Sequence, residues 1–258
     1  MNIAGSILLV TGSTHGVGRA IALGAARQGA GGILITGRDA DSAASVAAEI
    51  EGLGVAIAAH VADLADPAAP ASIVSACIER FGRVDALVNS AAVTDRSSFL
   101  DGTPETWERQ FSVNARAPFF LMQGVIADMR RRGAPGAIVN ILSINAYCGA
   151  PDLAIYSATK GALATLTKNA ANAHRFDRIR VNGINLGWTD TPGERKMQAV
   201  TLGQGEGWLG KAAAAQPFGR LLNAEDAARL ALFLLSDEAG PMTGALVDQE
   251  QWVVGSRH

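Results

Sequence analysis

Short, continuous apolar runs alternate with longer alanine-rich segments along almost the whole chain. The apolar runs lie at 7–11, 33–36, 56–60, 86–89, 137–141, 181–184 and 245–247. Runs of this kind are typical of strands that are buried on both faces of a parallel sheet. The segments between them suit helices, at 17–28, 40–51, 68–81, 103–132, 153–174 and 224–236. We therefore predict an α/β fold, a single doubly wound Rossmann-type domain over residues 1–258, whose central, mostly parallel seven-stranded sheet is flanked by helices.

The composition excludes several classes of protein. Hydrophobic residues make up 48% of the 258 residues and charged residues 18%, as in a globular protein rather than a disordered one. The net charge of −2 produces no strong field, so we expect neither nucleic acid nor a membrane as a partner. The chain has no run of roughly 18 apolar residues and no signal-peptide start, so we expect a cytoplasmic protein. Its two cysteines and four histidines lack metal-ligand spacing, so we expect no catalytic metal.

Residues 192–217 interrupt the alternation of strands and helices. This segment combines five glycines with the apolar side chains Met197, Leu202 and Trp208. It follows the sixth predicted strand, and this places it at the carboxyl edge of the sheet, where ligands bind in such folds. Long irregular segments inside compact domains are often lids. We predict a substrate lid, with an ordinary helical excursion as the alternative.

A glycine-rich turn follows the first predicted strand and opens into the first predicted helix. Gly12 permits a sharp turn, Gly16 lets the backbone approach a phosphate, and Gly18 lets the helix pack closely on the strand. The amino end of the helix then offers free N–H groups and a positive dipole to the phosphates. The turn predicts a dinucleotide site, with a plain tight turn as the alternative. The predicted contacts are Gly12, Ser13, Thr14, His15, Gly16, Val17 and Gly18.

The tip of the second predicted strand bears on which dinucleotide binds. Proteins that prefer NAD usually place a carboxylate there to bind the ribose 2′-hydroxyl. This strand instead ends in Thr36, Gly37 and Arg38, and a guanidinium can fork onto a 2′-phosphate. Asp39 follows directly and argues in the other direction. We favour NADP over NAD, and a solvated turn arginine is the alternative.

Four polar residues suggest acid–base chemistry. Tyr156 and Lys160 lie four residues apart in a helical segment, so the phenol and the ammonium share one face. A nearby cation favours the phenolate and lowers the pKa of a tyrosine. Ser143 follows a buried strand, and Asn114 is a poor helix former inside a predicted helix. The alternatives are that Tyr156 and Lys160 are a surface pair on a helix, that Ser143 is a turn residue and that Asn114 is a structural amide.

Taken together, these motifs resemble the short-chain dehydrogenase/reductase superfamily in its common soluble form, over residues 11–248. The turn matches the family's TGxxxGxG pattern, and Tyr156 and Lys160 match its YxxxK pattern. Ser143 and Asn114 stand where the family has the other two catalytic residues. The resemblance implies that Tyr156 is the general acid/base and that Lys160 lowers its pKa and binds the nicotinamide ribose. It also implies that Ser143 binds the substrate oxygen and that Asn114 holds a water linked to Lys160.

The resemblance implies further contacts and an assembly. Further cofactor contacts would be Asp63, Leu64, Asn89, Ala91, Gly187, Thr189 and Thr191. Candidate substrate contacts are Ser143, Asn145, Tyr147, Leu153 and Trp188. Family members are commonly tetramers, so a homotetramer is implied. The chain departs from the family's usual glycine or proline pattern at Ala92, Leu186, Gln249 and Glu250.

The function that follows is an oxidoreductase that transfers hydride between NAD(P)(H) and a small alcohol or ketone. Asn145, Tyr147 and Trp188 would suit a sugar, a polyol or a hydroxy acid, whereas Leu153 and Met197 would suit an apolar ketone. A dinucleotide-binding sensor or scaffold that has lost catalysis is the alternative from another class. An isomerase or lyase that uses the same tyrosine is a third.

Overall fold

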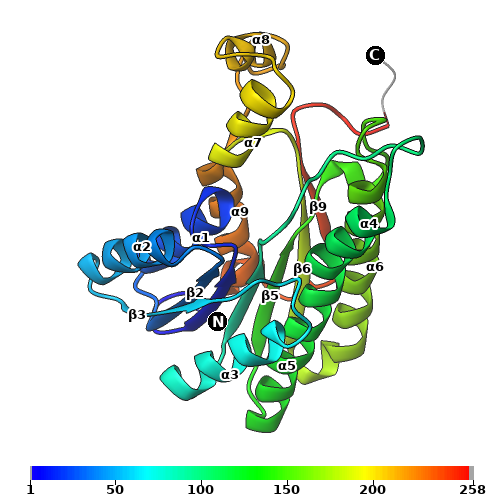
Figure 1. The fold of residues 1–258 in the computed structure, drawn as a ribbon. Coiled ribbons are helices and arrows are strands. Elements are labelled where there is room, and N and C mark those ends of the chain that lie inside the picture. The colour runs from blue at the N-terminus through cyan, green and yellow to red at the C-terminus, as the bar shows by residue number, and fades with distance from the viewer. Residues whose placement is uncertain (1, 256–258) are drawn as a thin grey trace.

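The computed structural model describes residues 2–255, and its centre is one seven-stranded sheet (Figure 1). The strand order is β3-β2-β1-β4-β5-β6-β9, and every neighbouring pair is parallel. All seven predicted strands are present, and the doubly wound α/β fold is confirmed. Their bounds are β1 Ile7–Thr11, β2 Gly32–Gly37, β3 Ala56–Val61, β4 Ala86–Asn89, β5 Gly136–Ile141, β6 Ile179–Leu186 and β9 Leu246–Gln249.

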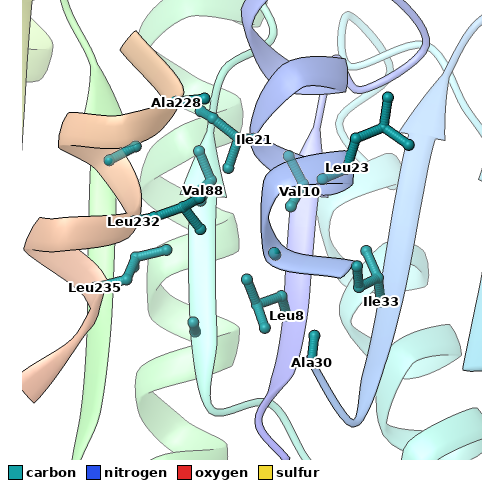
Figure 2. Close-up of a cluster of buried hydrophobic side chains, with 14 of the residues drawn as sticks. Leu8, Val10, Ile21, Leu23, Ala30, Ile33, Val88, Ala228, Leu232 and Leu235 are labelled. Carbon is teal, nitrogen blue, oxygen red and sulfur yellow. The ribbon is translucent and has the colours of Figure 1, made fainter. Parts of the chain in front are cut away.

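Helices cover both faces of the sheet, because side chains along a buried strand point alternately to opposite faces. In β1, Leu8 and Val10 pack with α1 (Gly16–Arg27), α2 (Ala40–Gly52) and α9 (Ala224–Leu235), as Figure 2 shows in part. Ile7 and Leu9 pack on the other face with α3 (Ala69–Phe81), α5 (Ala117–Arg132) and α6 (Ala154–His174). A near-continuous apolar strand therefore serves two cores at once.

The segment that predicts one long helix over 103–132 is interrupted in the structure. Thr103 caps α4 (Pro104–Phe111), a π-helical turn covers Ser112–Arg116, and α5 begins at Ala117. Pro118 accounts for the interruption, since it has no N–H to donate to the Asn114 carbonyl one α-helical turn earlier. The single-helix prediction is wrong here, and Asn114 lies inside the π-helical turn, a feature found frequently at functional sites.

Residues 192–217 are more regular than predicted. They contain α7 (Pro192–Lys196), a π-helical turn (Met197–Thr201) and α8 (Trp208–Ala214). Short strands β7 (Thr189–Asp190) and β8 (Leu222–Asn223) pair in parallel at the base of this segment. Trp208, Ala212 and Leu221 form a small separate core, and α7 and α8 project beyond the carboxyl edge of the sheet (Figure 1). Within residues 2–255, no helix has the length and apolar character needed to cross a membrane.

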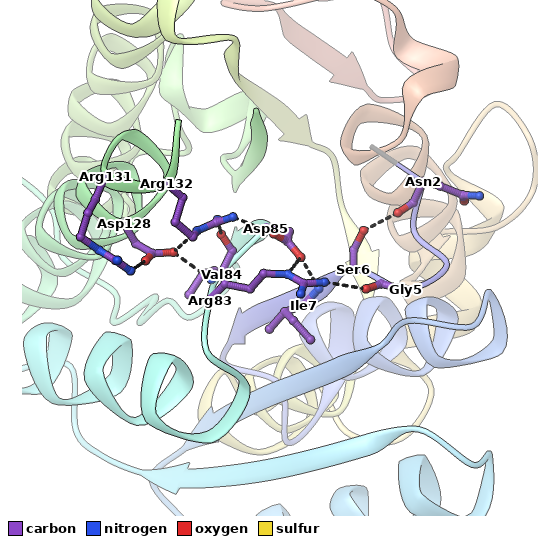
Figure 3. Close-up of polar contacts among 10 residues, drawn as sticks. All are labelled: Asn2, Gly5, Ser6, Ile7, Arg83, Val84, Asp85, Asp128, Arg131 and Arg132. Atoms are coloured by element: carbon purple, nitrogen blue, oxygen red, sulfur yellow. Dashed lines mark hydrogen bonds and ion pairs between the residues drawn. The ribbon is translucent and has the colours of Figure 1, made fainter. Parts of the chain in front are cut away.

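A polar network ties α5 to the amino edge of the sheet, at the opposite end from α7 (Figure 3). The buried Asp128 carboxylate accepts from the Val84 backbone N–H at 3.1 Å and from Arg131 and Arg132 at 2.6 and 2.9 Å. Burial raises the pKa of Asp128, but these hydrogen bonds outweigh it and hold the pKa below its ordinary value. Asp85 accepts from the Ile7 N–H at 2.9 Å, so the starts of β1 and β4 are fixed together.

Candidate active site

A cavity of about 580 Å³ lies at the carboxyl edge of the sheet. The turns after β1, β2 and β3 line one end, and the loops after β4, β5 and β6 line the other with the start of α6. These connections meet at one edge because the carboxyl ends of parallel strands lie on the same side of the sheet. This is the position at which the sequence predicted a ligand site.

The glycine turn packs so closely against neighbouring backbone that other residues would not fit. Gly12 and Gly16 have left-handed φ values of 61° and 56°, which disfavour residues with a Cβ. A Cβ at Gly12 would lie 2.6 Å from the Ala91 Cα, and one at Gly18 would lie 2.3 Å from the Gly12 carbonyl oxygen. His15 is the N-cap of α1 but makes no side-chain capping hydrogen bond. The first N–H groups of α1 are therefore not covered by their own cap. Gly12, Gly16 and Gly18 also line the cavity, so the turn brings backbone without side chains to it, and this fits a pyrophosphate.

Ser13 differs from the other predicted contacts of this turn. Its hydroxyl donates to the Val10 carbonyl at 2.7 Å and accepts from the Thr36 N–H at 3.0 Å. The side chain is fully buried and lies outside the cavity lining. Ser13 thus joins β1 to β2, whereas Gly12, Thr14, His15, Gly16, Val17 and Gly18 line the cavity.

Arg38 and Asp39 have different surroundings and different partners. Arg38 is exposed and lines the cavity beside Thr14 and Gly37. The Asp39 carboxylate instead caps α2, where it accepts from the Ser42 N–H at 2.7 Å. This hydrogen bonding lowers the pKa of Asp39, so the carboxylate stays ionised at its cap. Asp39, the carboxylate that favoured NAD in the sequence, is therefore engaged in capping α2.

Tyr156, Lys160 and Ser143 meet at the other end of the cavity, all three of them buried. The Lys160 Nζ donates to the Ile141 carbonyl at 2.7 Å and lies 5.7 Å from the centroid of the Tyr156 ring. Ser143 lies two residues after the end of β5 and directly precedes a short 3₁₀ turn (Ile144–Ala146), and its hydroxyl accepts from the Asn145 N–H at 3.1 Å. The segment after β5 and the start of α6 thus place a hydroxyl, a phenol and an ammonium together.

Burial dominates the electrostatics of this group. It raises the pKa of Tyr156 to about 12, against a hydrogen bond with Ser143 that lowers it. It lowers the pKa of Lys160 to about 8. In the protein chain alone the phenol is therefore protonated at neutral pH. The expected lowering of the Tyr156 pKa by Lys160 is not seen in the protein chain alone, where burial sets the direction of the shift.

Asn114 lies just outside the cavity lining and is fully buried. Its side-chain oxygen accepts from the Val93 N–H at 2.9 Å, and its amide donates to the Val93 carbonyl and to the Thr159 hydroxyl at 2.9 and 3.1 Å. Asn114 therefore connects the loop after β4 to α6, at the residue next to Lys160.

Comparison with known proteins agrees with this geometry. Residues 12–249 match the Enoyl-(Acyl carrier protein) reductase family. The L-rhamnose 1-dehydrogenase (NAD(P)(+)) of Sphingomonas sp. (strain SKA58) is 34% identical over 260 residues, which cover 97% of this chain and 98% of that protein. The chain belongs to the short-chain dehydrogenase/reductase superfamily.

Two further members of the superfamily extend the comparison. The sorbitol dehydrogenase of Cereibacter sphaeroides is 34% identical over 248 residues, 93% of each chain. The crystal structure of L-sorbose reductase from Gluconobacter frateurii, complexed with NADPH and L-sorbose, superposes with a TM-score of 0.91 at 29% identity and covers 100% of both chains. The fold of this short-chain dehydrogenase/reductase is thus shared along its whole length.

Most of the remaining predicted contacts line the cavity of this short-chain dehydrogenase/reductase, namely Asp63, Leu64, Ala91, Asn145, Leu153, Gly187, Trp188, Thr189 and Thr191. Asn89 does not, because its amide donates to Asn140 at 2.8 Å in the buried layer between β4 and β5. Tyr147 also lies outside the lining. Its hydroxyl donates to Asp248 at 2.9 Å and accepts from Asn185 at 3.0 Å, and more than half of the side chain is exposed.

The family departures change the cavity wall locally. Ala92 and Leu186 both line the cavity. The Glu250 carboxylate packs against Gly187, where an added Cβ would lie 2.3 Å from one carboxylate oxygen. Gln249 donates to the Asp226 carbonyl at 2.9 Å and so ties the end of β9 to α9. The sequence did not single out Arg96, and it marked Glu194 and Gln198 only as part of the predicted lid, but all three line the cavity.

Proposed function

We propose that this chain is an NAD(P)-dependent oxidoreductase that transfers hydride between the cofactor and a small alcohol or ketone. The observation that carries the proposal is one cavity lined both by the glycine turn and by Tyr156, Ser143 and Lys160. A dinucleotide whose phosphates lie on the α1 amino end can reach these three side chains within that cavity. When bound, the nicotinamide supplies or accepts the hydride.

The protein's own residues manage the proton and the developing charge. Tyr156 is the general acid/base that gives or takes the proton of the substrate oxygen. Ser143 donates a hydrogen bond to that oxygen, where negative charge develops. The Lys160 ammonium binds the nicotinamide ribose and, once this end of the cavity is filled, favours ionisation of Tyr156. Asn114 positions Lys160 through Thr159.

We propose NADP as the preferred cofactor. Arg38 lines the cavity beyond the tip of β2, and the neighbouring carboxylate of Asp39 is used to cap α2. A free guanidinium suits a 2′-phosphate, whereas no carboxylate at the strand tip is available for a ribose 2′-hydroxyl. Asp63 and Leu64 would line the adenine end.

The rest of the proposal concerns the whole protein. We propose that residues 192–217 form a substrate lid on a single domain, supported by the three lining residues Gly193, Glu194 and Gln198. A sugar, a polyol or a hydroxy acid is the proposed substrate class, and the relatives named for rhamnose, sorbitol and sorbose support its polyhydroxylated members. A cytoplasmic location, from the sequence features, and a homotetramer, from the family resemblance, complete the proposal.

Cofactor calorimetry followed by one substitution tests this function. We expect purified protein to bind NADP or NADPH more tightly than NAD or NADH. Tyr156→Phe should keep this binding and lose turnover of alcohols by at least about 10²-fold, because it removes only the proton carrier. Failure to bind any dinucleotide would reject the cofactor site. Binding without turnover in the unaltered protein would favour the sensor or scaffold instead.

A further inference from the structure

The substrate end of the cavity contains two charged side chains that the hydride-transfer chemistry does not use. Arg96 lies in the loop after β4, and Glu194 lies in the first turn of α7. Both act on the phenol at the centre of the site. After burial, Glu194 raises the pKa of Tyr156 and Arg96 lowers it, so each lies within electrostatic reach of the reacting oxygen.

The Glu194 carboxylate is held by neutral groups. One of its oxygens accepts from the Trp188 indole N–H at 2.8 Å and from the Gln198 amide at 2.6 Å. Among residues 2–255, no ion pair joins Glu194 to a cation, whereas its neighbour Arg195 pairs with Asp190 at 2.6 Å. Two neutral donors fix the direction of the carboxylate and leave its negative charge uncompensated.

The charge of Arg96, in contrast to that of Glu194, is compensated. Its Nη1 lies 3.3 Å from a carboxylate oxygen of Asp152, a residue outside the cavity lining, so its positive charge is already balanced within the protein. Its buried Nε has no hydrogen-bond partner within the described part of the chain. A buried N–H donor without a partner is costly, and a ligand oxygen would satisfy it.

We propose that Arg96 and Glu194 select a neutral polyhydroxylated substrate, a sugar or a polyol, and disfavour sugar acids and hydroxy acids. Glu194 accepts hydrogen bonds from substrate hydroxyls, and the Arg96 Nε donates to another substrate oxygen. The inference rests on the proposed oxidoreductase function and specifies its substrate class. A substrate carboxylate would meet the uncompensated charge of Glu194, and an apolar ketone would leave both groups unsatisfied.

The test compares neutral hexitols and pentitols with the matched aldonates, in steady-state assays with NADP. We expect kcat/KM for the best neutral polyol to exceed that for its aldonate by at least about tenfold. Glu194→Gln keeps the shape and the acceptor for Trp188 but removes the charge. It should raise KM for polyols about tenfold, because a charge-assisted hydrogen bond is roughly twice as strong as a neutral one, and lower KM for aldonates.

Two further variants separate this role from general damage. Glu206→Gln removes the same charge from an exposed residue of the same segment outside the cavity lining, and we expect unchanged preference. Arg96→Lys keeps the charge but loses the Nε donor, so KM for polyols should rise while aldonates gain nothing. Calorimetry with NADP checks that each variant still binds the cofactor.

The outcomes are distinct. A preference for aldonates would overturn the selection by charge, and so would a Glu194→Gln variant with unchanged substrate preference. In both cases the oxidoreductase function stands. Turnover of apolar ketones alone would overturn the selection as well. If the protein binds NADP but turns over none of these compounds, the proposed function fails, and the inference fails with it.

Discussion

Replacing Lys160 with methionine should stabilise the fold while it removes activity. Lys160 is only 2% exposed, and burial lowers its pKa from 10.5 to about 8. At about 1.36 kcal/mol per pH unit, this difference corresponds to a penalty of about 3 kcal/mol for the buried ammonium at neutral pH. Methionine avoids the charge but loses the hydrogen bond to Ile141, worth about 1 kcal/mol. We expect the free energy of unfolding to rise by about 2 kcal/mol at neutral pH.

The pH dependence identifies the cause of this gain. Because the folded-state pKa lies below the unfolded-state value, the unfolded chain binds one more proton between pH 8 and 10.5. Wild-type stability should therefore rise relative to Lys160→Met across that window and keep a constant deficit below it. Urea unfolding of both proteins measures the difference, with Lys168→Met, at an exposed position of the same helix, as the control. A variant that is less stable at neutral pH, with a difference that stays flat across the window, would refute the reasoning.

Three more substitutions test the cofactor turn, the cofactor preference and the amino-edge network. Arg38→Ala should weaken NADP binding about 10- to 100-fold in calorimetry and leave NAD binding nearly unchanged, because it removes a charge-assisted contact; equal losses would reject its selecting role. Gly18→Ala should lower the free energy of unfolding by about 1–3 kcal/mol and impair cofactor binding, since its Cβ would overlap the Gly12 backbone. Gly210→Ala, whose Cβ meets nothing within 4 Å, is its matched control and should be neutral or stabilising. Asp128→Asn should cost about 3 kcal/mol by urea unfolding at neutral pH. Because the Asp128 pKa is lowered, that difference should shrink as the pH falls below 3.8, and a constant difference would contradict it.

The parts of the fold that the sequence predicted are those that neighbouring residues determine. Each strand is a run of apolar residues buried on both faces, so composition alone marks it. The glycine turn is equally local, because Gly12 and Gly16 need left-handed φ values that few other residues adopt. Thr103 and Asn223 cap α4 and α9 with their own side chains, as these residue types commonly do.

The structure departs from the expected positions of side chains where distant segments decide their partners. Tyr147 was a candidate substrate contact because its side chain would suit a small polar ligand. The 3₁₀ turn Ile144–Ala146 instead directs the phenol to Asp248 at the end of β9, a contact between residues 101 positions apart. Ser13 shows the same effect, since the pairing of β1 with β2 claims its hydroxyl.

The roles that we infer for Arg96 and Glu194 in substrate selection could not be predicted from the sequence either, because they too depend on contacts between distant segments. Arg96 follows β4 and Glu194 follows β6, and the sheet order β4-β5-β6 brings the two loops to one edge. A charged residue after a strand is common, so position alone cannot separate Arg96 from the exposed Asp95, or Glu194 from the exposed Arg195. What separates them is burial and partnership, which arise only after the loops pack together. The candidate catalytic residues could therefore be recognised from a linear motif, whereas the substrate preference that we propose depends on contacts between loops that lie far apart in the sequence.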